Sequence, residues 1–114
     1  MAQGRYPRLS APLRICGQEI KNRVVVPAMS DFGTVALDGL VQQSHVDRYE
    51  AYARGGAGLV ITKACSVVRM HENRDSLVLE DDACIVGMRR MSCAIHKHGR
   101  GPCANHAHWP CHHA

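Results

Sequence analysis

The stretch that decides the fold is SHVDRYEAYARGGAGLVITKA, residues 44–64. Ser44 stands three residues before Asp47, so its hydroxyl is placed to cap a free backbone N–H at a helix start. Apolar residues then recur at i, i+3 and i+7 on one helical face: Val46, Tyr49 and Ala53. A Gly-Gly pair ends this pattern, and the apolar run 59–62 is typical of a buried strand. The stretch therefore predicts a helix, a turn and a strand.

The sequence before this stretch predicts a hairpin and an earlier strand. In residues 12–22, Leu13 and Ile15 alternate with Arg14 ahead of a Gly-Gln turn signal, which is typical of a short hairpin. The β-branched run 23–27 does not alternate, as in strands of parallel sheets that are buried on both faces. A polar, glycine-containing loop, residues 30–43, leads to the helix.

The sequence after residue 80 predicts a second helix. Asp81 and Asp82 offer a cap and negative charge at a helix start. An apolar stripe follows: Ile85, Met88, Met91 and Ile95. Residues 96–99, HKHG, read as a helix end with basic residues and a terminal glycine. The order hairpin, β, α, β, α predicts an α/β fold built from parallel βαβ units.

Composition limits the class of protein. The chain has 114 residues, which suits one small domain or a piece of a larger one, and 46% of them are hydrophobic. No apolar run approaches the ~20 residues of a membrane span, and the first ten residues lack the apolar core of a secretory signal. We therefore expect a cytoplasmic protein that does not bind a membrane. The net charge of +4 is interleaved along the chain and aromatics are 4%, so we expect no nucleic-acid partner.

The last fifteen residues, RGPCANHAHWPCHHA, differ abruptly from the rest. We therefore divide the chain into residues 1–99 and an atypical tail, residues 100–114. One interpretation of the tail is a zinc site, although the spacing C-x2-H-x-H-x2-C-H-H matches no standard arrangement. A second is a frameshift or mis-assigned gene end near Gly99, and a third is a disordered natural tail. We assign no metal ligand.

The cysteines and histidines outside the tail have structural interpretations. Four scattered cysteines are expected to be reduced and packed: Cys16, Cys65, Cys84 and Cys93. His96 and His98 are expected to be charge partners at a helix end. His45 and His71 are expected to lie at the surface.

Three blocks of the sequence resemble the NADH:flavin oxidoreductases, the old yellow enzyme family. Residues 9–30 resemble the pattern S-P-L-x-I-G-x-x-x-L-K-N-R-I-V-x-x-P-M, with Ala28 in place of the usual proline. Residues 49–64 resemble Y-x-x-R-A-x-G-G-x-G-L-I-I-x-E-A/G, with Lys63 in place of the frequent acidic residue. Residues 81–99 resemble D-D-x-x-I-x-G-x-x-x-L-x-x-A-I-H-K-H-G. The resemblance implies a partial TIM (β/α)8 barrel: an N-terminal hairpin plus the first two βα units, unclosed.

The resemblance also implies a function and a cofactor site. Such proteins transfer hydride from NADH or NADPH through FMN to a small activated alkene. The implied FMN contacts follow the two strands: Pro27, Ala28, Met29, Ser30 and Ala64. The alternatives are a loop cap for Ser30, a core position for Met29 and close packing for Ala64. No catalytic residue is assigned.

Length argues that this chain alone is inactive. A complete barrel takes about 250 residues, and its phosphate site comes from the loops after strands 7 and 8. Two alternatives to the enzyme therefore stay open, a small Cys/His metal-binding or interaction module and a non-functional gene fragment. The oligomeric state is open too.

Overall fold

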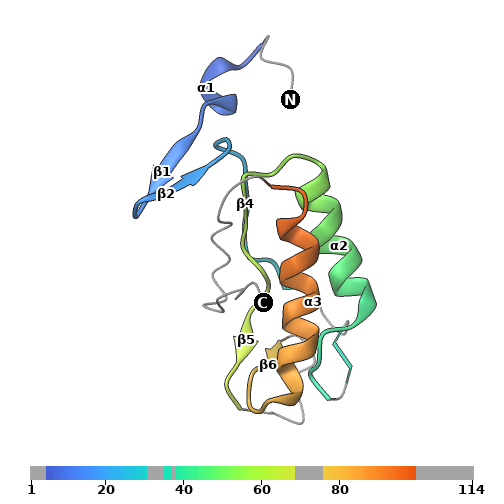
Figure 1. Cartoon of the computed structure of the whole chain (residues 1–114). Helices are drawn as coiled ribbons and strands as arrows, with labels where there is room; N and C mark the ends of the chain where they lie inside the picture. Colours follow the sequence, from blue (N-terminus) through green and yellow to red (C-terminus); the bar gives the residue numbers. More distant parts are fainter. Residues whose placement is uncertain (1–4, 31–34, 37, 69–75, 100–114) are drawn as a thin grey trace.

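The computed structural model describes residues 5–30, 35–36, 38–68 and 76–99. Two long helices lie side by side along one side of short strands, and a hairpin projects from one end (Figure 1). The elements follow one another as α1 (Pro7–Ser10), β1 (Leu13–Ile15), β2 (Gln18–Ile20), β3 (Val25–Val26), α2 (Gln43–Arg54), β4 (Leu59–Val60), β5 (Cys65–Ser66), β6 (Leu77–Val78) and α3 (Ala83–His96). The described residues therefore make a small α/β piece whose sheets are unclosed.

The predicted hairpin is confirmed. β1 and β2 pair antiparallel, with Leu13 opposite Ile20 and Ile15 opposite Gln18. The two residues of the turn, Cys16 and Gly17, have positive φ angles of 48° and 82°. Two positive φ angles suit the right-handed twist of a two-residue hairpin.

β3 and β4 form the predicted parallel pair, but the burial of β3 was predicted wrongly. Val25 lies opposite Leu59 and Val26 opposite Val60. The N–H of Ile61 extends the ladder by donating to the Val26 carbonyl at 2.9 Å. Val25 is 47% exposed rather than buried, because the described residues place no element over its side chain. The pair is therefore covered from the helix side and open on the other.

α2 carries the predicted apolar face but begins earlier than predicted. Val46, Tyr49 and Ala53 are buried, as expected. The helix starts at Gln43, so Ser44 lies inside the first turn and does not cap it. The ring of His45 instead accepts the Gln42 N–H through Nδ1 at 3.0 Å, which satisfies that N–H at the helix start. His45 is only 2% exposed, so the expectation of a surface histidine was wrong.

α3 matches its prediction closely. The Asp81 carboxylate accepts the Ala83 N–H at 3.0 Å at the start of the helix. Met88, Met91 and Ile95 are buried, and Ile85 is partly buried. The helix ends at His96, three residues before Gly99.

Three short elements were not predicted. α1 is a single turn, and β5 pairs parallel with β6, with Cys65 opposite Leu77 and Ser66 opposite Val78. Strands of two residues and a helix of four are too short to show a period of two or 3.6, so these elements leave no pattern in the sequence. β6 nevertheless supplies Leu77, which is fully buried.

The cysteines only partly follow the packing expectation. The four within the described residues are free thiols. Cys84 is buried and Cys65 half-buried, but Cys16 and Cys93 are exposed. Cys16 lies in the hairpin turn, and Cys93 follows the buried pair Met91 and Ser92 on the outer side of α3. The expectation of packing was therefore wrong for these two.

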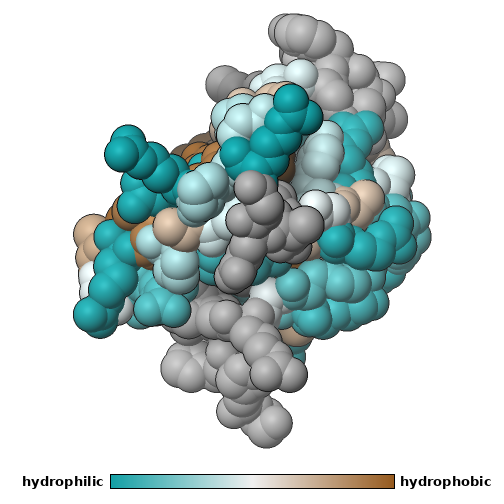
Figure 2. Space-filling view, turned by 90° about the horizontal axis from the view of Figure 1, so that it is seen from above, coloured by the Kyte–Doolittle hydropathy of each residue, from teal (hydrophilic) through white to brown (hydrophobic). Residues whose placement is uncertain are grey.

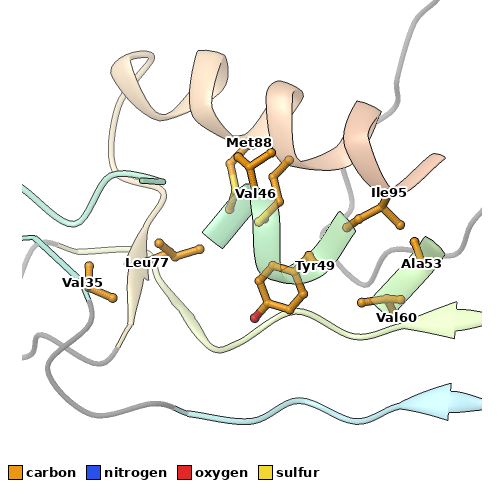
Figure 3. Packing of buried hydrophobic residues seen from close by; sticks show 9 residues of the cluster. Val35, Val46, Tyr49, Ala53, Val60, Leu77, Met88 and Ile95 are labelled. Atoms are coloured by element: carbon orange, nitrogen blue, oxygen red, sulfur yellow. The ribbon is translucent and has the colours of Figure 1, made fainter. Parts of the chain in front are cut away.

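The hydrophobic core lies between the two helices, β4 and β6 (Figure 3). Its buried members are Val35, Val46, Tyr49, Ala53, Val60, Leu77, Met88, Met91 and Ile95. From above, polar side chains cover much of the visible surface, with hydrophobic side chains showing between them (Figure 2). The tail, residues 100–114, and His71 lie outside the described residues.

Candidate functional site

The structure brings the predicted cofactor residues to one end of a strand pair. Residues 27–30 directly follow β3, and Ala64 comes four residues after β4. Because β3 and β4 run parallel and in register, their carboxyl ends lie at the same end of the pair. In parallel α/β folds this is the end at which active sites are built.

All five predicted residues are exposed. Met29 is 50% exposed, so the alternative of a core methionine is wrong. The exposure of Ala64 likewise rules out close packing within the described residues. Two more apolar side chains, Val67 and Val68, are exposed just after β5. The open end of the pair is therefore an accessible and largely apolar surface.

Two hydrogen bonds of Asn22 and a close approach at Gly58 fix the opposite, amino end of the strand pair. The Asn22 side chain donates to the Gly56 carbonyl at 2.7 Å and accepts the Val24 N–H at 3.0 Å. A Cβ on Gly58 would lie 2.5 Å from Asn22 Oδ1, so only glycine fits there without a shift. These contacts hold β3 and β4 together before either strand begins.

The carboxyl end of β4 is held by a buried hydrogen bond from α2. The Tyr49 hydroxyl accepts the Lys63 N–H at 2.8 Å. Burial is the main cause that raises the Tyr49 pKa, and the Lys63 hydrogen bond partly opposes it. The hydroxyl therefore stays protonated at neutral pH. Through this bond α2 fixes the residue that precedes Ala64.

Lys63 is itself buried, at 2% exposure, and its charge acts on two neighbours. Burial and then the Lys63 charge lower the pKa of His45, against a raising effect of the Gln42 backbone hydrogen bond. Burial raises the pKa of the Cys65 thiol, and Lys63 opposes this shift. From the sequence, Lys63 stands out only as a departure from a family pattern. His45 and Tyr49 lie four residues apart on one helical face, and this spacing is the signal that could have indicated a shared buried environment.

The expected charge partners at the end of α3 are partly confirmed. His98 Nε2 lies 2.9 Å from Glu50 Oε1 on α2, and the Lys97 ammonium pairs with the same oxygen at 2.5 Å. Hydrogen bonds from His98 and then Lys97 lower the Glu50 pKa from 4.5 to about 2. These contacts join the two helices far from the open end of the strands, as expected for a structural role.

Two further classes of site are absent from the described residues. No group of three or more Cys, His, Asp or Glu side chains there could hold a metal ion. The Cys/His tail lies outside these residues, so the zinc interpretation stays a prediction. No helix in the same ranges is long and apolar enough to cross a membrane.

Comparison with known proteins gives several matches, each over a small part of the relative. No family model matches the chain. It is 34% identical over 96 residues to an NADH oxidase of Thermoanaerobacter brockii, covering 82% of this chain and 15% of that protein. It is 30% identical over 102 residues to an NADPH dehydrogenase of Bacillus licheniformis, covering 89% of this chain and 30% of the relative.

Solved structures agree with these sequence matches. The old yellow enzyme from Trypanosoma cruzi aligns with a TM-score of 0.67 and 26% identity, over 81% of this chain and 24% of that one. The chain therefore spans less than a third of each of these three relatives.

Proposed function

Because the chain belongs, as a small part, to the family of old yellow enzymes and NADH:flavin oxidoreductases, we propose that it contributes to a flavin site. In this proposal residues 1–99 are the hairpin and first two βα units of an FMN-binding (β/α)8 barrel. The observation that carries it is the parallel register of β3 and β4, with Val26 opposite Val60. This register places residues 27–30 and Ala64 at a common, exposed end.

Each of these residues has a proposed role toward the flavin. Ala28 and Ala64 are small, so the backbone can approach a planar ring closely. Met29 offers an exposed apolar side chain to the ring. The Ser30 hydroxyl can donate a hydrogen bond to a carbonyl of the flavin pyrimidine and so tune its electron affinity. Bound FMN would supply hydride transfer, with NADH or NADPH as the reductant and a small activated alkene as the substrate.

The complete reaction is proposed for a whole barrel rather than for these 114 residues. A closed barrel needs about 250 residues, and its phosphate site lies in the loops after strands 7 and 8. We therefore expect the chain by itself to show no turnover. A cytoplasmic location is proposed with the same family function.

A chimera tests the proposed site. Residues 9–99 would replace the matching segment of the Trypanosoma cruzi old yellow enzyme, and flavin bound to the purified protein would be measured by its visible absorbance. We expect a yellow protein. Ala64→Trp should lower FMN affinity at least tenfold, because the indole occupies the space of the ring.

The matched control for this substitution is Val86→Trp, since Val86 is 66% exposed on α3. It should leave FMN affinity unchanged. A folded chimera that binds no flavin, or equal effects of the two substitutions, would overturn the assignment of this end of the strands.

A further inference from the structure

His45 has a protonation state that the hydrogen bonds define. A backbone N–H can only donate, so the contact from Gln42 at 3.0 Å makes Nδ1 of His45 an acceptor. A neutral ring that accepts through Nδ1 must carry its proton on Nε2. The geometry therefore assigns the Nε2–H tautomer to the folded chain.

A second proton has no favourable place on this ring. Nε2 is buried and finds no hydrogen-bond partner among the described residues, and His45 as a whole is 2% exposed. The added proton would go to Nδ1, the atom that accepts the Gln42 N–H. Two N–H groups would then face each other at the first turn of α2, and the hydrogen bond there would be lost.

The charges around the ring also disfavour protonation. Lys63, from the segment after β4, places a buried positive charge whose field lowers the His45 pKa. The N-terminus of α2 adds the positive end of the helix dipole. Other ionisable groups of the neighbouring segments are Asp38 in the preceding loop, Asp47, Arg48 and Tyr49 in α2, Cys65 in β5, and Arg90 in α3, which contacts the Gln43 side chain.

The two acidic groups in that set are engaged elsewhere. Asp38 accepts the Leu40 N–H at 3.0 Å, and Asp47 accepts from the Gln43 side chain at 2.7 Å. Tyr49 and Cys65 have raised pKa values and are neutral at pH 7. Neither acid therefore compensates a charge on His45 through a hydrogen bond.

We propose that His45, Tyr49 and Lys63 form an acid-sensitive latch between α2 and the end of β4. The neutral His45 ring closes the first turn of α2. Tyr49, one turn later on the same buried face, then holds the Lys63 N–H at 2.8 Å. Protonation of His45 opens the first turn and releases the residue that precedes Ala64. Acidification would thereby loosen the open end of the strand pair.

The direction of the pH effect follows from the lowered pKa. The unfolded or opened state binds a proton at the ordinary His pKa of 6.5, whereas the latched state resists it. The latch is therefore fully stable above pH 6.5 and weakens as pH falls below that value. The latched population continues to fall relative to the open one until the pH reaches the lowered pKa of the latched state.

Nuclear magnetic resonance of the full chain tests the latch without flavin, so its result is independent of the proposed function. Long-range ¹H–¹⁵N spectra at pH 7.5 should show the Nε2–H tautomer of His45, and its titration midpoint should lie below 6.5. The protection factor of the Lys63 amide against hydrogen exchange should be lower at pH 5.5 than at pH 7.5.

Two variants separate the latch from general acid sensitivity. His45→Gln keeps an acceptor for the Gln42 N–H, since glutamine is a normal capping-box residue at this position, but it cannot titrate. Its Lys63 protection should be constant over the same pH range. His98→Gln, the matched control, should retain the pH dependence.

Three results would overturn the latch: an Nδ1–H tautomer, a His45 midpoint at or above 6.5, or an unchanged pH dependence in His45→Gln. If His45→Gln does not fold, the tautomer and midpoint of the unsubstituted chain decide the question alone.

Discussion

The two sides of the β3–β4 pair differ sharply in how fully their apolar side chains are buried. On the helix side, Val60 belongs to one buried cluster with Tyr49 and Ala53 of α2 and Ile95 of α3 (Figure 3). On the open side and at the carboxyl end, Val25 and Met29 are about half exposed. The helix layer, which consists of α2, α3 and the strand side chains that they cover, is thus buried by elements of this chain. The other face of the strands resembles a surface that further strands would cover.

The largest expected effect contrasts two methionines, one on each side. Met91→Ala should lower the free energy of unfolding by about 2–5 kcal/mol, because Met91 is 2% exposed in the helix layer. Met29→Ala should change it by less than about 0.5 kcal/mol, because Met29 is half exposed. Urea denaturation followed by circular dichroism measures both. Equal effects would show that the two sides do not differ in packing.

A smaller effect concerns the contact that joins the helix layer to the open end. Tyr49→Phe removes the hydroxyl that accepts the Lys63 N–H and leaves that buried donor without this acceptor. We expect a loss of about 1–3 kcal/mol in the free energy of unfolding. Tyr52→Phe is the control, since Tyr52 is only partly buried on the same helix. If the two substitutions cost the same, the Tyr49 hydroxyl does not hold the strand end.

The smallest effect lies at the far end of the helix layer. The hydrogen bonds from His98 and Lys97 lower the Glu50 pKa to about 2, so this contact stabilises the fold above pH 4.5 and is lost as pH falls toward 2. Glu50→Gln should therefore flatten the fall in Tm between pH 5 and 2.5. The effect should be modest because surface ion pairs contribute little.

Asp47→Asn serves as the control for this acid window, because Asp47 accepts a hydrogen bond from the Gln43 side chain one turn earlier on α2 and not from the end of α3. It should leave the fall in Tm unchanged. A fall in Tm that is the same in Glu50→Gln and in the unsubstituted chain would contradict the role given to Glu50.

Much of the helix layer could be predicted from the sequence because its signals are local. The stripes on α2 and α3 repeat over three turns, and the predicted parallel pairing of their strands is confirmed. The start of α2 was missed because the residue that satisfies its first turn is a histidine, whereas serine at a cap position is the commoner signal. The burial of His45 and Lys63 could not be predicted, since it depends on where β4 ends relative to α2.

The strand side was harder to predict for a different reason. A continuous apolar run indicates a strand covered on both faces, but coverage is supplied by other elements and is not encoded in the run itself. Val25 therefore carries a core-like sequence signal and an exposed side chain. The cofactor role of residues 27–30 and Ala64 rests on family resemblance and stays a prediction.

Hydrogen exchange of the full chain, read residue by residue at pH 7.5, tests the difference between the two sides most directly. The account predicts slow exchange in the middle of α2 and α3 and at Ile61 and Lys63, whose amides are bonded across the β3–β4 pair and to Tyr49. It predicts fast exchange at residues 28–30, beyond the end of β3. Protection of residues 28–30 equal to that of the helices, or fast exchange throughout α2 and α3, would contradict it.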